Sequence, residues 1–190
     1  MLSTFLSVVG LAGGLFYAGL ESMIPCIPPA PLSTAVLSTD HCVILQYMGS
    51  WYFVAAAAWD EDGIRAFNGT DSSVLDIQKE DNTTLKVSER WRIGDTCHSN
   101  SWNYMVHSVT DPLMFRDDFD AIAMIWDGKW INCPSCIVIL MVDDDEEISA
   151  MLFSRDEKTS DKVMEEFKSK TECVLMEDLI KAPVTKDYCK

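Results

Sequence analysis

Eight short segments with strand character follow one another between residues 51 and 155, and they constrain the fold more than any other feature. In residues 85–92, for example, Leu85, Val87 and Trp91 fall on one face and the basic residues on the other. Turn signals such as Asp127-Gly128 separate the segments. The segments are 51–59, 74–78, 85–92, 102–106, 113–116, 121–126, 136–142 and 148–155. This pattern predicts an all-β protein, an eight-stranded antiparallel up-and-down β-barrel.

The end of the chain changes to a helical period. Residues 136–142 are apolar on both faces, as expected for a strand between a lined cavity and a covering element. Capping residues at 159–160 then precede Val163, Phe167 and Val174, which recur at helical spacing. We therefore expect one C-terminal α-helix packed outside the barrel, followed by an extended tail. A barrel of eight strands has room inside for one small ligand.

Two acidic segments interrupt the strands. Residues 60–71 are predicted to form a long loop with room for one helical turn, and 143–147 to form a hairpin tip. Neither has the ligand pattern of a calcium loop. We expect solvated loops here and no metal site.

The N-terminal part of the chain predicts secretion or anchoring. Residues 5–20 are an unbroken apolar segment, about as long as a signal sequence core and short for a membrane span. No Lys or Arg precedes it and no clean cleavage site follows, so residues 1–22 are either a signal peptide or a retained hydrophobic anchor. Four prolines make 23–47 an extended arm, and the domain occupies 48–190. No other membrane-spanning segment is expected.

Charge and cysteine content restrict the compartment and the partners. A chain of 190 residues suits one domain, and seven cysteines indicate an oxidising environment. Asn68 and Asn82 lie in glycosylation sequons within polar stretches. A net charge of −15 argues against nucleic-acid binding, because phosphates would be repelled. A secreted, extracellular glycoprotein is expected.

Several motifs resemble one protein family. Gly49 stands two residues before Trp51 at the start of the first strand, which is similar to the Gly-x-Trp signature of the lipocalins. Residues 22–190 resemble the apolipoprotein M and alpha-1-acid glycoprotein branch, most specifically in the helical segment 165–173. Cys189 also falls where both families have their last cysteine. The resemblance implies a barrel that binds a small hydrophobic ligand. It also implies that Arg155, at the end of the last strand, stacks on Trp51.

The same resemblance implies a disulfide pattern. It pairs Cys26 with Cys173 and Cys97 with Cys189. The third disulfide of apolipoprotein M cannot form, because Val163 stands where its second cysteine would be. The three cysteines that remain allow at most one further bond and leave at least one thiol in a monomer; they are Cys42, Cys133 and Cys136.

The spacing Cys133-x-x-Cys136 also occurs in redox and zinc motifs. A redox pair of the thioredoxin type opens a helix, whereas this one opens a strand. No second cysteine pair completes a zinc site. We interpret the pair as structural.

The candidate ligand-lining residues are large side chains on the predicted strands. Trp102 lies five residues after Cys97, as a ligand-lining tryptophan does in apolipoprotein M. Ser149 stands where that family has an arginine that holds the phosphate of sphingosine 1-phosphate, and an inward arginine elsewhere could replace it. The candidates are Trp91, Trp102, Tyr104, Phe115, Met124, Ile139 and Met151, with Arg92 and Arg116 as cations.

No catalytic arrangement stands out. The lipocalin that is an enzyme, prostaglandin D synthase, uses a cysteine on an early strand, and residues 74–78 contain none. We expect no catalysis, cofactor or metal, and a secreted lipocalin that carries a hydrophobic or amphipathic ligand such as a lysophospholipid or sphingolipid. Association with lipoprotein particles is left open. The alternatives are a plasma protein that sequesters cationic drugs or toxins, and a lipoprotein-particle surface interaction protein.

Overall fold

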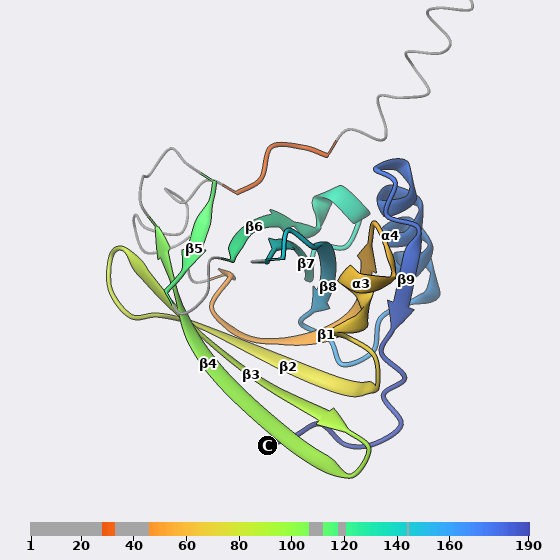
Figure 1. The fold of residues 1–190 in the computed structure, drawn as a ribbon, viewed down its shortest axis with the longest axis horizontal. Helices are drawn as coiled ribbons and strands as arrows, with labels where there is room; N and C mark the ends of the chain where they lie inside the picture. Colours follow the sequence, from red (N-terminus) through yellow and green to blue (C-terminus); the bar gives the residue numbers. More distant parts are fainter. Residues whose placement is uncertain (1–27, 33–45, 107–111, 118–120, 144) are drawn as a thin grey trace, which may run out of the picture.

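A computed structural model describes residues 28–32, 46–106, 112–117, 121–143 and 145–190. Its regular elements are mostly strands (Figure 1). The strands are β1 Gly49–Ala58, β2 Thr70–Lys79, β3 Thr84–Ile93, β4 Thr96–Val106, β5 Met114–Arg116, β6 Ile122–Asp127, β7 Cys136–Val142, β8 Ile148–Ser154 and β9 Asp178–Lys181. The helices are α3 Glu61–Arg65, the 3-10 helix η3 Gly128–Ile131 and α4 Asp161–Cys173.

Strands β1 to β8 form the closed antiparallel barrel that the strand pattern predicts. Each strand from β2 to β8 pairs with the next, and β8 pairs with β1. Pairing of Gly49–Tyr52 with residues 74–77 of β2 then closes the ring. The eight-stranded barrel with α4 outside it is confirmed.

The tail contains a ninth strand that the sequence analysis did not predict. The register of β1 against β8 shifts between Phe53 and Ala55, and beyond that point β9 pairs with β1 in place of β2. The tail thereby covers a strand edge that would otherwise be unpaired.

The Asp127-Gly128 signal does not produce a two-residue hairpin. Helix η3 follows β6, and the chain reaches β7 only at Cys136. A Cβ at Gly128 would lie 1.6 Å from the carbonyl oxygen of Cys133, so only glycine fits here. Cys133 and Cys136 form a disulfide within this connection.

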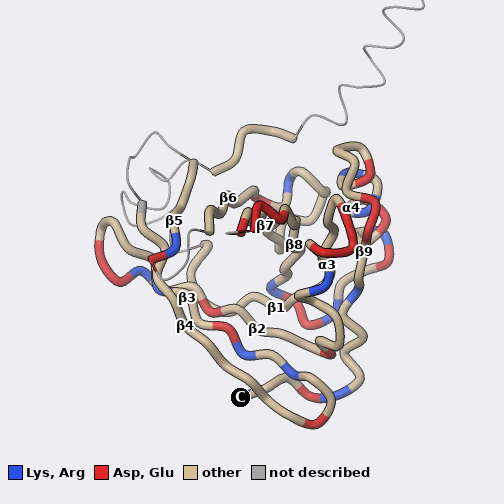
Figure 2. Tube along the Cα trace, viewed as in Figure 1, with Lys and Arg blue, Asp and Glu red and all other residues tan. Residues whose placement is uncertain are grey.

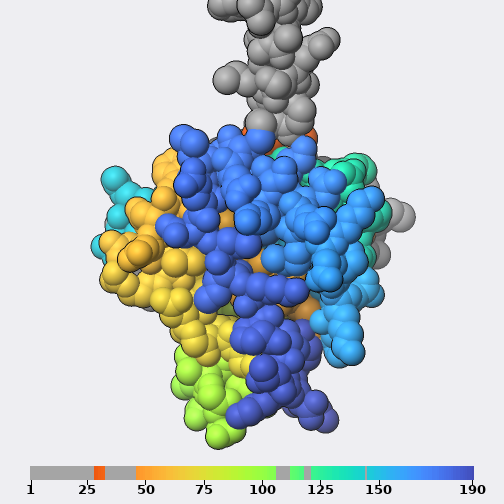
Figure 3. All heavy atoms as spheres, turned by 90° about the vertical axis from the view of Figure 1, so that its right-hand side faces the viewer, coloured from red at the N-terminus to blue at the C-terminus, as the bar shows by residue number. Residues whose placement is uncertain are grey.

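Two apolar clusters lie on opposite faces of the barrel wall. The outer cluster joins Met164 and Phe167 of α4 to Ala55 and Ala57 of β1 and to Val138 of β7. The inner cluster includes the neighbours of Val138 on β7, which explains why that strand is apolar on both faces. Figure 3 shows α4, β9 and the tail covering this side of the molecule.

Arg155 and Trp51 close one end of the barrel, as the resemblance implies. The Arg155 guanidinium carbon lies 3.7 Å from the centroid of the Trp51 ring. The guanidinium also donates hydrogen bonds to three backbone carbonyl oxygens, those of Gln46, Met48 and Ser50. Gly49 has a φ of +89°, a conformation that lets the chain pass beneath the guanidinium.

A long-range disulfide ties the tail to the barrel. Cys97 at the start of β4 is bonded to Cys189, which lies 92 positions later in the sequence. Cys173 is also disulfide-bonded. Its expected partner Cys26 lies outside the described residues, as does Cys42.

Little of the N-terminal region falls within the described ranges. Residues 28–32 form neither helix nor strand, and they run beside β6, where the Leu32 N–H donates to the carbonyl of Ile125. The signal or anchor predicted at residues 1–22 lies outside the described residues. Among the helices that are described, none has the length and apolar character needed to cross a bilayer.

Candidate ligand-binding site

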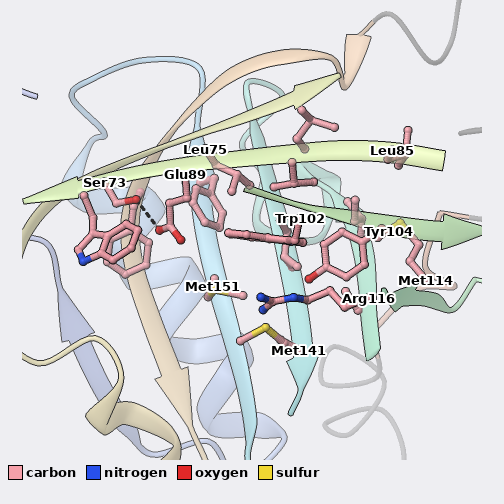
Figure 4. Close-up of a pocket in the computed structure, with 18 of the residues that line it drawn as sticks. Ser73, Leu75, Leu85, Glu89, Trp102, Tyr104, Met114, Arg116, Met141 and Met151 are labelled. Atoms are coloured by element: carbon pink, nitrogen blue, oxygen red, sulfur yellow. Dashed lines mark hydrogen bonds between the residues drawn. The ribbon is translucent and has the colours of Figure 1, made fainter. Parts of the chain in front are cut away.

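The barrel encloses a cavity of about 280 Å³ (Figure 4). All eight barrel strands and the connection after α3 contribute to its wall. The lining residues are Phe53, Ala66, Phe67, Thr70, Ser73, Leu75, Ile77, Leu85, Val87, Glu89, Trp91, Trp102, Tyr104, Met114, Arg116, Ala123, Ile125, Ile139, Met141, Met151 and Phe153. Most are apolar or aromatic, as is usual for sites that bury a small apolar ligand.

Six of the nine candidate residues line this cavity. Residues paired across neighbouring strands share one face of the sheet, which explains why several candidates lie together. Ile139 and Met151, for example, are paired across β7 and β8. The six are Trp91, Trp102, Tyr104, Ile139, Met151 and Arg116.

The other three candidates lie outside the lining. Phe115 lies between Met114 and Arg116, which both line the cavity, so its side chain points to the opposite face. Met124 belongs to the outer cluster under α4. Arg92 donates from Nε to the carbonyl of Asp187 and thus holds the tail.

Arg116 and Trp102 form a polar corner in the apolar wall. The Arg116 guanidinium carbon lies 4.5 Å from the centroid of the Trp102 ring. The indole N–H of Trp102 is buried and has no hydrogen-bond partner among the described residues. A positive charge and a buried N–H donor side by side suit an acceptor group on a ligand.

The position that carries an arginine in apolipoprotein M adds no charge to this cavity. Ser149 is buried and lies two residues from Met151 on β8, so it faces the barrel interior. Among the described lining residues Arg116 is the only cation.

Glu89 is the functional candidate that the sequence analysis missed. It lies on β3 between Val87 and Trp91, and all three line the cavity. The Ser73 hydroxyl donates a hydrogen bond of 2.6 Å to Glu89 Oε1 (Figure 4). The alternation of residues 85–92 already put Glu89 on the apolar face, and that signal could have found it.

The environment of Glu89 disfavours its charged form. Burial in the barrel raises the pKa of its carboxyl group, while the Ser73 hydrogen bond and the positive charge of Arg116 act in the opposite direction. The net effect is a pKa above the ordinary value of 4.5.

A Glu89→Gln substitution is expected to stabilise the ligand-free protein by about 1–2 kcal/mol near pH 7.5, because it removes an ionisable group from an apolar site. In the wild type, the folded state favours the neutral acid. The neutral Glu89 carboxyl group therefore stabilises the folded wild type, fully below pH 4.5. This stabilisation is lost as the pH rises through the higher pKa of the folded state. The gain should therefore vanish near pH 4.

Urea unfolding of both proteins at pH 4 and pH 7.5 would measure this difference. Glu80→Gln, an exposed position in the turn between β2 and β3, is the matched control and should change stability at neither pH. An equal gain for Glu89→Gln at both pH values would show that the gain does not come from removing the ionised carboxyl group.

Acidic side chains gather at one end of the cavity. Burial, followed by the charges of Asp143, Asp62, Asp145 and Asp60, raises the pKa of Glu147. The α3 segment and the β7–β8 turn therefore lie close together (Figure 2). Both segments adjoin the cavity, because Phe67 and Met141 line it.

Comparison with known proteins places this geometry among related folds. The family described as the ApoM domain matches residues 8–190. The solved structure of the siderocalin Ex-FABP has a TM-score of 0.63 and 16% sequence identity, and the match covers 75% of this chain and 97% of that chain. At this identity the likeness concerns the fold. A search of curated proteins found no match.

Proposed function

This chain belongs to the ApoM domain family of the lipocalins, and from that premise we propose that it is a secreted carrier of an amphipathic lipid, such as a lysophospholipid or a sphingolipid. The ligand chain would occupy the barrel and its polar end would contact Arg116 and Trp102. No catalytic step is part of the proposal.

The observation that carries the proposal is an apolar cavity with one cationic corner. Burial of a hydrocarbon chain contributes about 25 cal/mol per Å² before the costs of association. The Arg116 guanidinium can donate two parallel hydrogen bonds to a phosphate or carboxylate, and the Trp102 N–H can supply a third. A molecule with an acceptor head group and a flexible tail matches this cavity better than a fully apolar one.

Titration of tryptophan emission tests the proposal directly, because Trp91 and Trp102 line the cavity. Lysophospholipids are expected to change the emission saturably, and fatty acids and retinol serve as comparison ligands. An unchanged emission spectrum with every ligand would refute the carrier function. Mass spectrometry of what co-purifies with the protein would identify the natural ligand.

A Met151→Trp substitution is expected to reduce lysophospholipid affinity at least about tenfold, because a larger ring fills part of the cavity beside Ile139. Since the added tryptophan changes the emission, binding is measured by calorimetry. Met105→Trp is the matched control, since Met105 is 38% exposed and does not line the cavity. Weakened binding in the control alone would place the ligand outside the barrel.

Secretion is supported by features of the exterior. The asparagines of both sequons, Asn68 and Asn82, are exposed, so glycosyl transfer would meet no steric barrier. The Cys97–Cys189 disulfide suits an oxidising compartment. N-terminal sequencing of protein from the medium should find a start near Met23, whereas a start at Met1 would favour a retained anchor.

We also propose that the protein associates with lipoprotein particles if residues 1–22 are retained. Gel filtration of the medium distinguishes the possibilities, because a particle-bound protein elutes far ahead of a 21.3 kDa monomer. Elution at monomer size would exclude this association. It would also exclude the rival function of a particle surface interaction protein.

The acidic end of the cavity favours one second candidate, capture of a cationic drug or toxin. Cationic dyes that bind in low salt and are released by 1 M salt without loss of lysophospholipid binding would support a separate, surface-based sequestering role.

A further inference from the structure

We propose that Glu89 is a specificity determinant of the cavity, which selects amphiphiles that carry a protonated amine over neutral amphiphiles of the same chain length. This inference rests on the proposed carrier function and names the ligand class of that same site.

The Glu89 carboxylate is held in place and keeps one oxygen available. Ser73 donates to Oε1, and no described residue donates a hydrogen bond to Oε2. Leu75, its partner across β2, is apolar and buried. The accessible surface that Glu89 retains faces the cavity, because the residue lies in its lining.

No described cation neutralises this carboxylate at contact distance. Arg116 acts on this carboxyl group through its charge, and the Ser73 hydroxyl is the described donor that contacts it. In Figure 4 the Glu89 carboxylate lies beyond one edge of the Trp102 ring, whereas the Arg116 guanidinium lies against the face of that ring. The cavity therefore offers two polar positions of opposite sign, separated by an indole ring.

A carboxylate in an apolar cavity is costly unless a cation with hydrogen-bond donors faces it. A primary ammonium group has the charge and three donors. Glu89 attracts an ammonium group and repels a carboxylate, whereas Arg116 has the opposite effect on each, and a neutral alcohol meets neither charge effect. Comparing an amine with an alcohol before and after Glu89 is neutralised therefore isolates the effect of that carboxylate. The acidic side chains around Glu147, on segments that adjoin the cavity, add a longer-range attraction for a cation.

The role of Glu89 also predicts that the affinity for an amine depends on pH. Because the pKa of Glu89 is raised, an ammonium ligand binds most tightly when the carboxyl group is ionised, and its affinity should fall as the pH is lowered. The other titratable or charged side chains that face this region are Arg116 on β5, Tyr104 on β4 and His98, which stacks on Trp91 at a centroid distance of 5.5 Å.

The experiment compares dodecylamine, dodecanol and dodecanoate, followed by tryptophan emission at pH 7.5. Wild-type protein is expected to bind the amine about tenfold more tightly than the alcohol, the size of one charge-assisted hydrogen bond. Glu89→Gln, which keeps the side-chain shape, should weaken amine binding about tenfold and change alcohol binding less than about twofold. Glu80→Gln is the exposed control and should change neither.

Each result decides the proposal. An unchanged ratio of amine to alcohol affinity in Glu89→Gln, or a wild type that prefers dodecanol to dodecylamine, would overturn the role of Glu89 and leave the carrier function intact. Failure of all three probes to bind the wild type would overturn both. A fall in amine affinity from pH 7.5 to pH 5 that persists in Glu89→Gln would assign the linkage to another group and also count against Glu89.

Discussion

Replacing Arg155 by alanine is expected to lower the free energy of unfolding by about 3–5 kcal/mol. The substitution removes charge-assisted hydrogen bonds to three backbone carbonyl oxygens, each typically about 1.5–3 kcal/mol and not additive. It also removes a cation–π contact of about 1–2 kcal/mol with Trp51, a residue that is only 3% exposed. Urea unfolding at pH 7.5 measures the loss.

Two further variants separate charge from geometry. Arg155→Lys keeps the positive charge, but lysine lacks the planar guanidinium group that can donate to three acceptors. We therefore expect a smaller fall in the free energy of unfolding than for Arg155→Ala. Arg65→Ala removes an arginine whose side chain is 72% exposed and paired with Asp62, and it should cost less than about 1 kcal/mol. A loss for Arg155→Ala no larger than for Arg65→Ala would mean that this end of the barrel is closed by other contacts.

Replacing both Cys97 and Cys189 by serine is expected to destabilise the protein by about 4–5 kcal/mol. The two cysteines are 92 residues apart. On the chain-entropy model, a cross-link that closes such a long loop lowers the conformational entropy of the unfolded chain, which stabilises the folded state by about 4–5 kcal/mol. The tail also loses its covalent attachment beside Trp91, whose carbonyl lies next to Cys189. Thermal and urea unfolding under non-reducing conditions measure the effect.

The second disulfide provides the matched control. Cys133 and Cys136 are 3 residues apart, so the same model assigns their cross-link only about 1–2 kcal/mol. A double serine variant at these positions should therefore be the more stable of the two. The opposite order would show that native-state packing around η3, and not loop length, governs the contribution of these bonds.

The barrel itself could be predicted because strand patterns are local. Alternation and turn residues marked all eight strands, and the helix period marked α4. The ninth strand could not be found in this way, because residues 178–181 become a strand only where the register shift in β1 leaves an edge for them. The connection through η3 depends likewise on packing of Gly128 against Cys133, a contact that no local pattern encodes.

The site was predictable where strands are long. In β3 and β4 the alternation runs over many residues, so the inward positions of Trp91, Trp102 and Tyr104 could be assigned. Strand β5 has only 3 residues, too few for alternation to show which side chains point inward, and Phe115 was assigned to the wrong face. Glu89 was within reach of the same argument, but an acidic residue on an apolar face is normally assigned to the solvent side.

By itself the sequence determined that the chain alternates into eight strands, ends in one amphipathic helix and has the cysteines to hold its tail, because these properties depend on neighbours a few residues apart. Only the tertiary structure decided which side chains meet inside the barrel. Closure brings Ser73, Glu89, Trp102 and Arg116 from four different strands to one cavity, and their charges and pKa values depend on burial and distance there.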